Sequence, residues 1–238
     1  VQLDSEASEV HELIGANGAG KSTLIKIITG AVAMDPDGGD ITIGDEHVEI
    51  KNPNHARHLG ISAVYQEFSL INTLTVAENI FLGAPPTRVK HLSIDWKDMD
   101  ARAREVLAQL DTPIDTRCLV RDLSVAQRQV VEIAKALAKK PRVLIMDEPS
   151  ASLTDNDIEQ MFQVIRTLKA KGIGIVYVAH RLEELPQIAD RVTVFRDGKY
   201  VITLPMAEAP KHVIIEHMVG HRIEVKERPV RPHGEEAL

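Results

Sequence analysis

The sequence has little of several features that would assign it to a broad class. Its 238 residues contain one cysteine, Cys118, which excludes an internal disulfide framework and fits a reducing compartment. The longest apolar run, Ile173–Ala179, has seven residues, far fewer than the ~20 needed to span a bilayer. The segment Val1–Val10 is polar and acidic, unlike a signal peptide. We therefore expect any work at a membrane to depend on partner proteins.

Basic and aromatic residues are also scarce. The 28 Lys and Arg residues against 35 Asp and Glu residues give a net charge of −7, which argues against nucleic acid as a partner but leaves room for one local anion site. Aromatic residues make up 3% of the chain, and none precedes Tyr65. The hydrophobic content of 44% and the charged content of 26% are ordinary for a soluble globular protein.

The order of sequence patterns predicts an α/β core with a helical insert. Short segments that read as strands occur at Val10–Ile14, Ile61–Tyr65, Val143–Met146, Ile173–Val178 and Val192–Phe195, and Val143–Met146 is an apolar run of the kind buried in parallel sheets. Between the second and third of these segments, apolar residues recur at helical spacing, and Thr75–Glu78 matches a capping box. We expect residues 1–222 to form the folded unit, with helices inserted at about 67–140, a small antiparallel hairpin near Gly39–Gly44, and a linker at 223–238.

Residues Gly15–Ser22 fit the phosphate-loop pattern, in which glycine and four residues precede Gly-Lys-Ser. Glycines let successive backbone N–H groups surround phosphate oxygens at a helix N-terminus. The predicted strand before the loop and the helix after it disfavour the alternative, a chance glycine-rich turn. The predicted nucleotide-binding residues are Gly15, Asn17, Gly18, Ala19, Gly20, Lys21, Ser22 and Thr23. Lys21 would reach the β- and γ-phosphates, and the Ser22 hydroxyl would ligate Mg²⁺.

Val143–Glu148 is an apolar strand that ends in two carboxylates. This pattern places Asp147 at the carboxyl edge of the sheet, where it would hold Mg²⁺, and Glu148 beside it, where it would orient or deprotonate the attacking water. Alone, the pattern also suits an acidic strand end in solvent. Together with the phosphate loop it indicates a nucleoside triphosphatase.

Three further segments narrow the prediction. Gln66 ends a strand, Leu123–Gln127 precedes a helix, and His180 follows the strand Ile173–Ala179. The order and spacing of all five motifs resemble the ATP-binding cassette (ABC) family, whose fold is a P-loop NTPase core of RecA-like type. Finer matches, including Leu74–Gly83 and Val176–Glu184, look like the monosaccharide importers of the ribose, galactose and xylose group, and specifically their first cassette.

The resemblance implies a role for each remaining motif. Gln66 would sense Mg²⁺ and the γ-phosphate and couple them to the helical insert. The Ser124 hydroxyl and the following amides, including those of Ala126 and Gln127, would clamp ATP held by an opposite cassette. His180 would bind the γ-phosphate and hold water in line with Glu148, and Asp155 would lie in a loop that communicates across the dimer. The implied metal ligands are therefore Ser22, Gln66 and Asp147, and the catalytic residues Glu148, His180 and Gln66.

Two departures from the family pattern stand out. Val125 and Ala126 replace the usual pair of glycines in the signature segment, and a Cβ at Ala126 restricts close approach to a phosphate. No aromatic residue is present upstream of the phosphate loop to stack on adenine. From the resemblance we expect an N-terminally trimmed cassette in which loss of stacking weakens ATP binding roughly 5- to 30-fold.

The leading hypothesis is a transport ATPase that uses ATP and Mg²⁺ at the cytoplasmic face of the membrane. Its expected partners are a second cassette, fused downstream, membrane permease subunits and, indirectly, a periplasmic sugar-binding protein. One alternative is an isolated nucleotide-binding module with little activity. Another is an ABC ATPase of DNA repair or translation, which is disfavoured because the Gln66–Ser124 interval is too short for a coiled-coil arm and the net charge is negative.

Overall fold

A computed structural model describes residues 3–35, 38–88, 93–151, 153–179 and 181–220 of the chain. Its main sheet has six strands in the order β4-β5-β6-β1-β7-β8. These strands are β1 (Val10–Gly15), β4 (Ile61–Val64), β5 (Val143–Asp147), β6 (Gly174–Val178), β7 (Arg191–Arg196) and β8 (Lys199–Pro205). All neighbouring pairs are parallel except β7 and β8, which are antiparallel. The predicted α/β class is confirmed.

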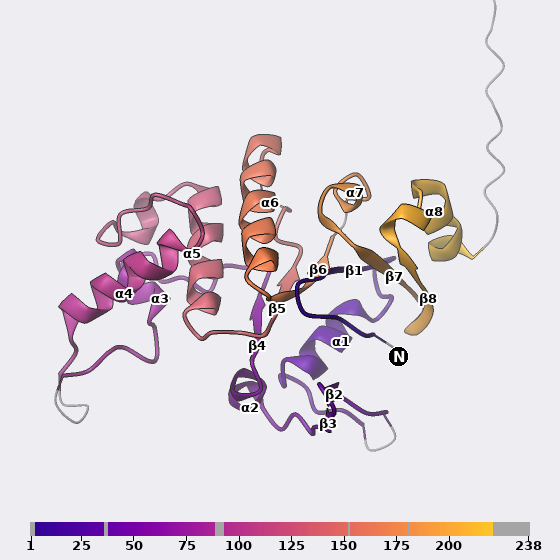
Figure 1. Cartoon of the computed structure of the whole chain (residues 1–238), viewed down its shortest axis with the longest axis horizontal. Helices are drawn as coiled ribbons and strands as arrows, with labels where there is room; N and C mark the ends of the chain where they lie inside the picture. Colours follow the sequence, from indigo (N-terminus) through magenta and orange to yellow (C-terminus); the bar gives the residue numbers. More distant parts are fainter. Residues whose placement is uncertain (1–2, 36–37, 89–92, 152, 180, 221–238) are drawn as a thin grey trace, which may run out of the picture.

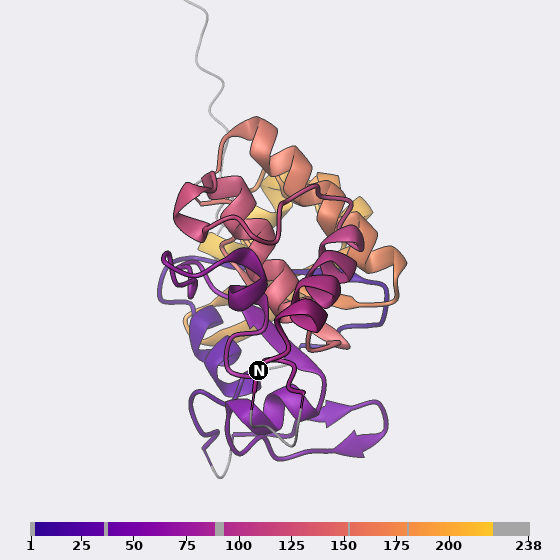
Figure 2. The same ribbon diagram turned by 90° about the vertical axis from the view of Figure 1, so that its left-hand side faces the viewer.

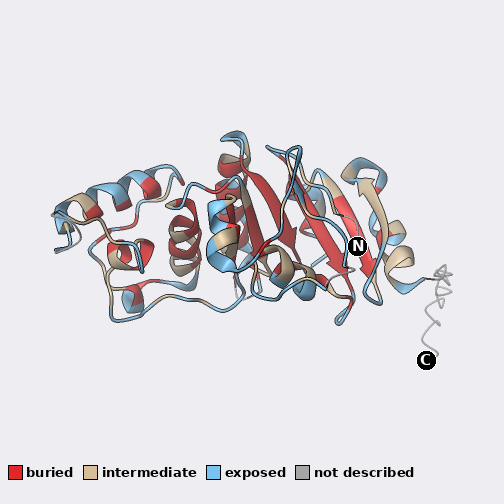
Figure 3. Cartoon of the chain, turned by 90° about the horizontal axis from the view of Figure 1, so that it is seen from below, coloured by how far each residue is buried: buried red, intermediate tan, exposed pale blue. Residues whose placement is uncertain are grey.

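The middle strands are apolar because both faces of the sheet are covered (Figures 1 and 3). All six residues of β1 and all five of β6 are buried. On one face, Leu13, Val176 and Val178 pack with Ile25 of α1 (Lys21–Ile28). On the other face, Tyr177 packs in one cluster with the apolar side of α6 (Asp155–Ala170). Two-sided burial explains why β6 appears in the sequence as an unbroken apolar run, whereas β1 also buries the polar residues His11 and Glu12.

Helices α3 (Val76–Ile80), α4 (Trp96–Ala108) and α5 (Val125–Leu137) lie together at one end of the molecule, on the left of Figure 1. The predicted capping box is present: Thr75 and Glu78 satisfy each other's backbone N–H groups at the start of α3. The predicted apolar face of α4 is buried through Met99, Ala103 and Leu107. These helices share a continuous core cluster with β5 and α6.

The predicted hairpin is a two-stranded antiparallel unit of β2 (Thr42–Ile43) and β3 (Glu46–His47). It lies at the bottom of the molecule in Figure 2, away from α6. The remaining helices are α2 (Pro53–His58), α7 (Leu185–Ile188) and α8 (Lys211–Val219), with short 3-10 turns at Val120–Asp122 and Met206–Glu208. In the described part of the chain no helix is both long and apolar enough to cross a bilayer.

The edge strand β8 was not predicted. Its residues are exposed or half-buried, although Tyr200–Leu204 is rich in aromatic and β-branched residues typical of strands. The turn before it, Asp197-Gly198, has positive φ at both residues (53° and 75°), a geometry typical of a tight hairpin. The dipeptide Asp-Gly between two such runs was therefore a sequence signal for a hairpin. The predicted linker at 223–238 lies outside the described residues.

Candidate nucleotide-binding site

The parallel strands bring several predicted site residues to one edge of the sheet. β1, β4 and β5 run in the same direction, so their carboxyl ends meet at that edge. The phosphate loop leaves β1 there, Gln66 follows β4, and Asp147 ends β5. Ligands of open α/β sheets bind outside the carboxyl ends of the strands. His180, predicted to follow β6, lies outside the described residues.

Glycine is required in the phosphate loop for two different reasons. Gly18 and Gly20 have φ values of 80° and 95°, in the left-handed region that side chains with a Cβ avoid. Gly15 pairs with Phe195 across β1 and β7, and an added Cβ would collide with the backbone carbonyl oxygen of Phe195. Gly20 is the N-cap of α1, and no side chain caps this helix. The N-terminal amides of α1 therefore lack a side-chain acceptor, which suits an anionic ligand.

Lys21 is buried and folds back over the loop that precedes it. Its Nζ donates to the carbonyl oxygen of Gly15 at 2.6 Å and lies 3.3 Å from that of Ala16. Burial lowers the pKa of Lys21, while the charges of Glu148 and Asp147 act in the opposite direction. The ammonium group therefore lies within electrostatic reach of both carboxylates, although β6 separates β5 from β1.

Asp147 and Glu148 occupy the carboxyl end of β5 and are both half-buried. The backbone N–H of Glu148 donates to the carbonyl oxygen of Val178 at 2.9 Å, which fastens this turn to β6. Glu148 has a φ of 52°, an unfavourable conformation for a residue with a Cβ. Such conformations gather at functional sites, where the surrounding structure holds them in place.

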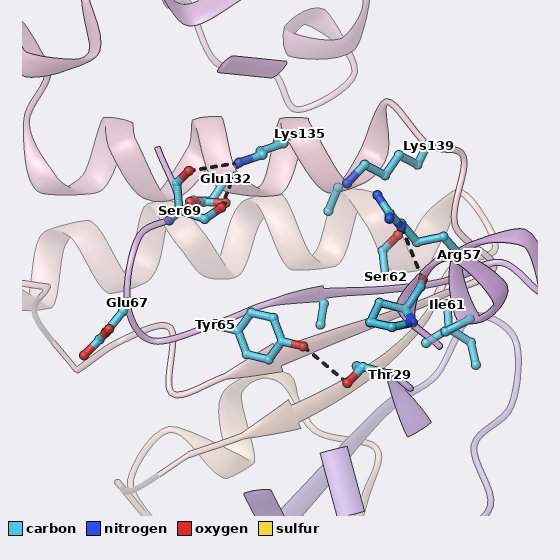
Figure 4. A pocket seen from close by; sticks show the side chains of 14 residues that line it. Thr29, Arg57, Ile61, Ser62, Tyr65, Glu67, Ser69, Glu132, Lys135 and Lys139 are labelled. Carbon is cyan, nitrogen blue, oxygen red and sulfur yellow. Dashed lines mark hydrogen bonds between the residues drawn. The ribbon is translucent and has the colours of Figure 1, made fainter. Parts of the chain in front are cut away.

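Gln66 is exposed directly after β4, and its segment is connected to α5. Ser69 donates from its backbone N–H and from its hydroxyl, at 3.2 Å, to the buried carboxylate of Glu132. Lys135 donates to the Ser69 hydroxyl at 2.7 Å. These contacts line one side of a pocket of about 230 Å³, whose other side carries Tyr65 (Figure 4). The segment after Gln66 is thus fixed to α5, whose first turn is formed by Val125–Gln127 of the signature segment rather than following that segment as expected.

Ser124 is the N-cap of α5 and forms a capping box with Gln127. The Ser124 hydroxyl accepts from the backbone N–H of Gln127 at 3.2 Å, and Gln127 Oε1 accepts from the backbone N–H of Ser124 at 3.0 Å. Both residues therefore mark a helix start rather than the strand edge. Val125 is exposed, and Ala126 is half-buried. Asp155, expected in a loop, is instead the first residue of α6, because Thr154 caps that helix and Asp157 completes the box.

The residues at the strand edge fit a magnesium ion chemically. Mg²⁺ prefers oxygen ligands, and the exposed Ser22 hydroxyl near the start of α1 and the Asp147 carboxylate supply them. Neither is part of a ready-made cage: among the described residues, no group of three or more His, Cys, Asp or Glu side chains is placed to hold a metal. A site with few protein ligands is expected for Mg²⁺ bound together with phosphate oxygens.

One buried contact of this region was not anticipated from the sequence. Ser150 and Tyr177 both donate to Glu184, at 2.9 and 3.0 Å. Tyr177 stands inside an apolar strand, and a buried tyrosine hydroxyl usually has a hydrogen-bond partner. That rule was the available signal for a polar residue beneath the sheet, but it did not indicate which one.

The fold and the loop together define a P-loop nucleotide-binding domain. Comparison with known proteins identifies the family of this domain. The chain belongs to the ABC transporter family, because the sequence model of that family matches residues 1–151.

Curated relatives match almost the whole chain. The ribose import ATP-binding protein RbsA 1 of Rubrobacter xylanophilus is 50% identical over 94% of the chain, and the protein of the same name from Streptomyces avermitilis is 47% identical over 100%. A putative ribose/galactose/methyl galactoside import ATP-binding protein of Burkholderia ambifaria is 47% identical over 95%. The chain spans only 44–45% of the length of these relatives.

Solved structures share the fold. A crystal structure of the ADP conformation of an ABC transporter cassette aligns with a TM-score of 0.79 and 28% identity, covering 93% of this chain and 91% of that one. A nucleotide-free cassette aligns with a TM-score of 0.77 and 27% identity, covering 91% and 90%. The predicted P-loop NTPase fold is therefore confirmed.

Proposed function

We propose that this chain is an ATP-binding and ATP-hydrolysing cassette of a sugar importer. The observation that carries the activity is the shared strand edge, where the phosphate loop and its buried Lys21 lie within electrostatic reach of Asp147 and Glu148. The names of the curated relatives, which are ribose or galactose import proteins, support the transport role. We further propose that residues 1–222 are one cassette with a helical insert at about 67–140.

Each site residue has a distinct task in this proposal. The loop amides and Lys21 bind the phosphates, and Lys21 exchanges its contact with Gly15 for the ligand. Mg²⁺, when bound, neutralises charge on the β- and γ-phosphates, and Ser22, Asp147 and Gln66 are the residues that would hold it. Glu148 orients the attacking water and accepts its proton, with His180 beside the γ-phosphate.

A second cassette and membrane permease subunits are the proposed partners, at the cytoplasmic face of the membrane. Ser124 and the amides after it would complete the ATP site of the opposite cassette. Gln66 would sense Mg²⁺ and the γ-phosphate in this chain's own site and couple them to the helical insert through the contacts of Ser69 with Glu132 and Lys135, because these contacts join its segment to α5. A periplasmic sugar-binding protein would act on the far side of the membrane.

The test replaces Glu148 by glutamine in the complete transporter that contains this chain. We expect ATP hydrolysis and sugar uptake to fall at least 100-fold while MgATP still binds, because loss of general base catalysis costs about 10²–10⁴ in rate. Glu105→Gln, an equivalent change on the exposed side of α4, is the matched control and should leave turnover unchanged. Undiminished hydrolysis in Glu148→Gln would remove Glu148 as the catalytic carboxylate. A chain that binds MgATP but supports no hydrolysis in the assembled transporter would be a binding module instead.

A further inference from the structure

A buried group of three polar side chains lies between the turn after β5 and the segment after β6. Ser150 stands two residues after Glu148 and is 4% exposed, Tyr177 belongs to β6 and is fully buried, and Glu184 is 3% exposed. Placing a carboxylate in such a position is costly unless hydrogen bonds compensate for lost water. The hydrogen bonds that offset this cost for Glu184 therefore indicate what the three side chains do together.

Both compensating hydrogen bonds converge on one oxygen atom. The Ser150 hydroxyl donates to Glu184 Oε2 at 2.9 Å, and the Tyr177 hydroxyl donates to the same atom at 3.0 Å. Burial raises the pKa of Tyr177, with the charge of Glu184 as a second cause, so this hydroxyl remains a donor. The other oxygen, Oε1, is buried without a hydrogen-bond partner among the described residues, and the Arg181 Nε is 3.9 Å away from it. Glu184 therefore holds the two donors through a single acceptor.

That acceptor holds the part of the turn that follows Glu148, through the Ser150 hydroxyl. The Glu148 N–H itself reaches β6 through the Val178 carbonyl oxygen at 2.9 Å, but the backbone bonds after it are local: Ala151 N–H donates to the Glu148 carbonyl oxygen at 3.3 Å, and Leu153 N–H donates to that of Ser150 at 3.1 Å. The first of these local bonds is long. Glu148 itself is held in a left-handed conformation, which persists only where the surroundings enforce it. Ser150 adds a buried side-chain bond to this turn.

A second link between the same two segments is weak by comparison. Arg181 Nη1 lies 3.6 Å from Asp155 Oδ1, but the Asp155 side chain is fully exposed and that of Arg181 is 49% exposed. Ion pairs of this kind contribute little because water screens them. The bond between Ser150 and Glu184 is buried, so it is the connection expected to transmit position.

We infer that Glu184 is a positioning residue that holds the turn bearing Glu148 through the Ser150 hydroxyl, in register with β6 and with the segment that follows it. The inference rests on the proposed function, because Glu148 is the carboxylate proposed to orient water. Glu184 itself touches no substrate. Its effect is on how often Glu148 occupies the position that supports hydrolysis.

The test compares Ser150→Ala with Tyr177→Phe, because each removes one donor to the same carboxylate oxygen and only the first donor belongs to the turn. In the complete transporter, Ser150→Ala should lower kcat about 10-fold, because this is the effect expected from losing one hydrogen bond to a charged group. MgATP affinity should change less than 2-fold. Tyr177→Phe should leave kcat within 2-fold even though it lowers the melting temperature. Glu184→Gln, which keeps an acceptor oxygen, should stay within about 3-fold of the unaltered protein, whereas Glu184→Ala should fall as Ser150→Ala does.

Amide hydrogen exchange of the unliganded chain provides a readout that does not need activity. Exchange at Ala151 and Leu153 should accelerate in Ser150→Ala and not in Tyr177→Phe. If kcat and exchange are unchanged in Ser150→Ala, or if Tyr177→Phe lowers kcat equally, the positioning role is wrong. If the unaltered transporter does not hydrolyse ATP, the proposed function fails, and the exchange comparison still decides whether Glu184 holds the turn.

Discussion

Gly15 and Gly18 in the phosphate loop exclude a side chain for different physical reasons, and alanine at each position separates the two. Gly18 has a φ of 80°, and an added Cβ would meet no atom within 4 Å. Gly18→Ala therefore costs only the left-handed backbone conformation, about 1–2 kcal/mol. At Gly15 the added Cβ would collide with the Phe195 carbonyl oxygen and lie 3.0 Å from the Ala19 Cβ.

The collision at Gly15 cannot be relieved by turning a side chain. The Phe195 carbonyl belongs to β7, which is paired with β1 along the ladder, so relief requires the two strands to move apart. Overpacking of this kind costs about 1–3 kcal/mol, and we expect the upper end because the obstacle is backbone. Urea unfolding should therefore show a larger loss of unfolding free energy for Gly15→Ala than for Gly18→Ala.

Nucleotide affinity should not follow the same order. Alanine at Gly18 favours a backbone that turns the loop amides away from one another, so MgATP affinity should fall roughly 5- to 30-fold even though this variant loses less unfolding free energy than Gly15→Ala. Gly18→Asn is the matched control, since asparagine adopts the left-handed conformation more readily, and it should be milder in both measurements. Equal losses of unfolding free energy for Gly15→Ala and Gly18→Ala would refute the distinction between collision and backbone strain.

Three further predictions concern buried titratable side chains on β1 and α1. Lys21→Met should lower MgATP affinity about 10- to 150-fold by removing a charge-assisted bond, while Lys26→Met, exposed on the same helix, should not change it in a nucleotide titration. Burial raises the pKa of Glu12 well above its ordinary value of 4.5, so the folded state retains a proton that the unfolded state loses. Stability should thus decline as pH rises above 4.5 toward the folded pKa, and Glu12→Gln should be more stable than the unaltered chain at pH 8 in urea unfolding but not at pH 4. Burial, with Arg191 as a second cause, lowers the pKa of His11 from 6.5 to about 4. Neutral His11 therefore contributes at most ~3 kcal/mol to the free energy of unfolding, and this contribution is complete above pH 6.5 and is lost as pH falls toward 4. Subtracting the pH profile of His11→Gln from that of the unaltered chain should isolate this acid-side loss; parallel profiles would contradict it.

Most of the secondary structure was predictable because its causes are local. The apolar runs at β5 and β6 follow from two-sided burial, and the starts of α3 and α6 follow from Thr75 and Thr154 as N-caps. The strand β8 was missed although Asp197-Gly198 and the run Tyr200–Leu204 are local hairpin signals, and as an edge strand it is only half-buried. The family pattern suggested a loop at Asp155, but the helix capped by Thr154 begins at this residue.

The phosphate loop was determined by the sequence alone, since glycines at fixed spacing before Lys21 already specify a backbone that surrounds an anion. Which residues share the strand edge was decided by the tertiary structure, because the order β5-β6-β1 brings Asp147 and Glu148 within reach of Lys21 across an intervening strand. Only the tertiary structure could reveal that Ser150, Tyr177 and Glu184 converge on one oxygen atom. Their contact joins residues up to 34 positions apart, and no local pattern distinguishes a buried Glu184 from an exposed one.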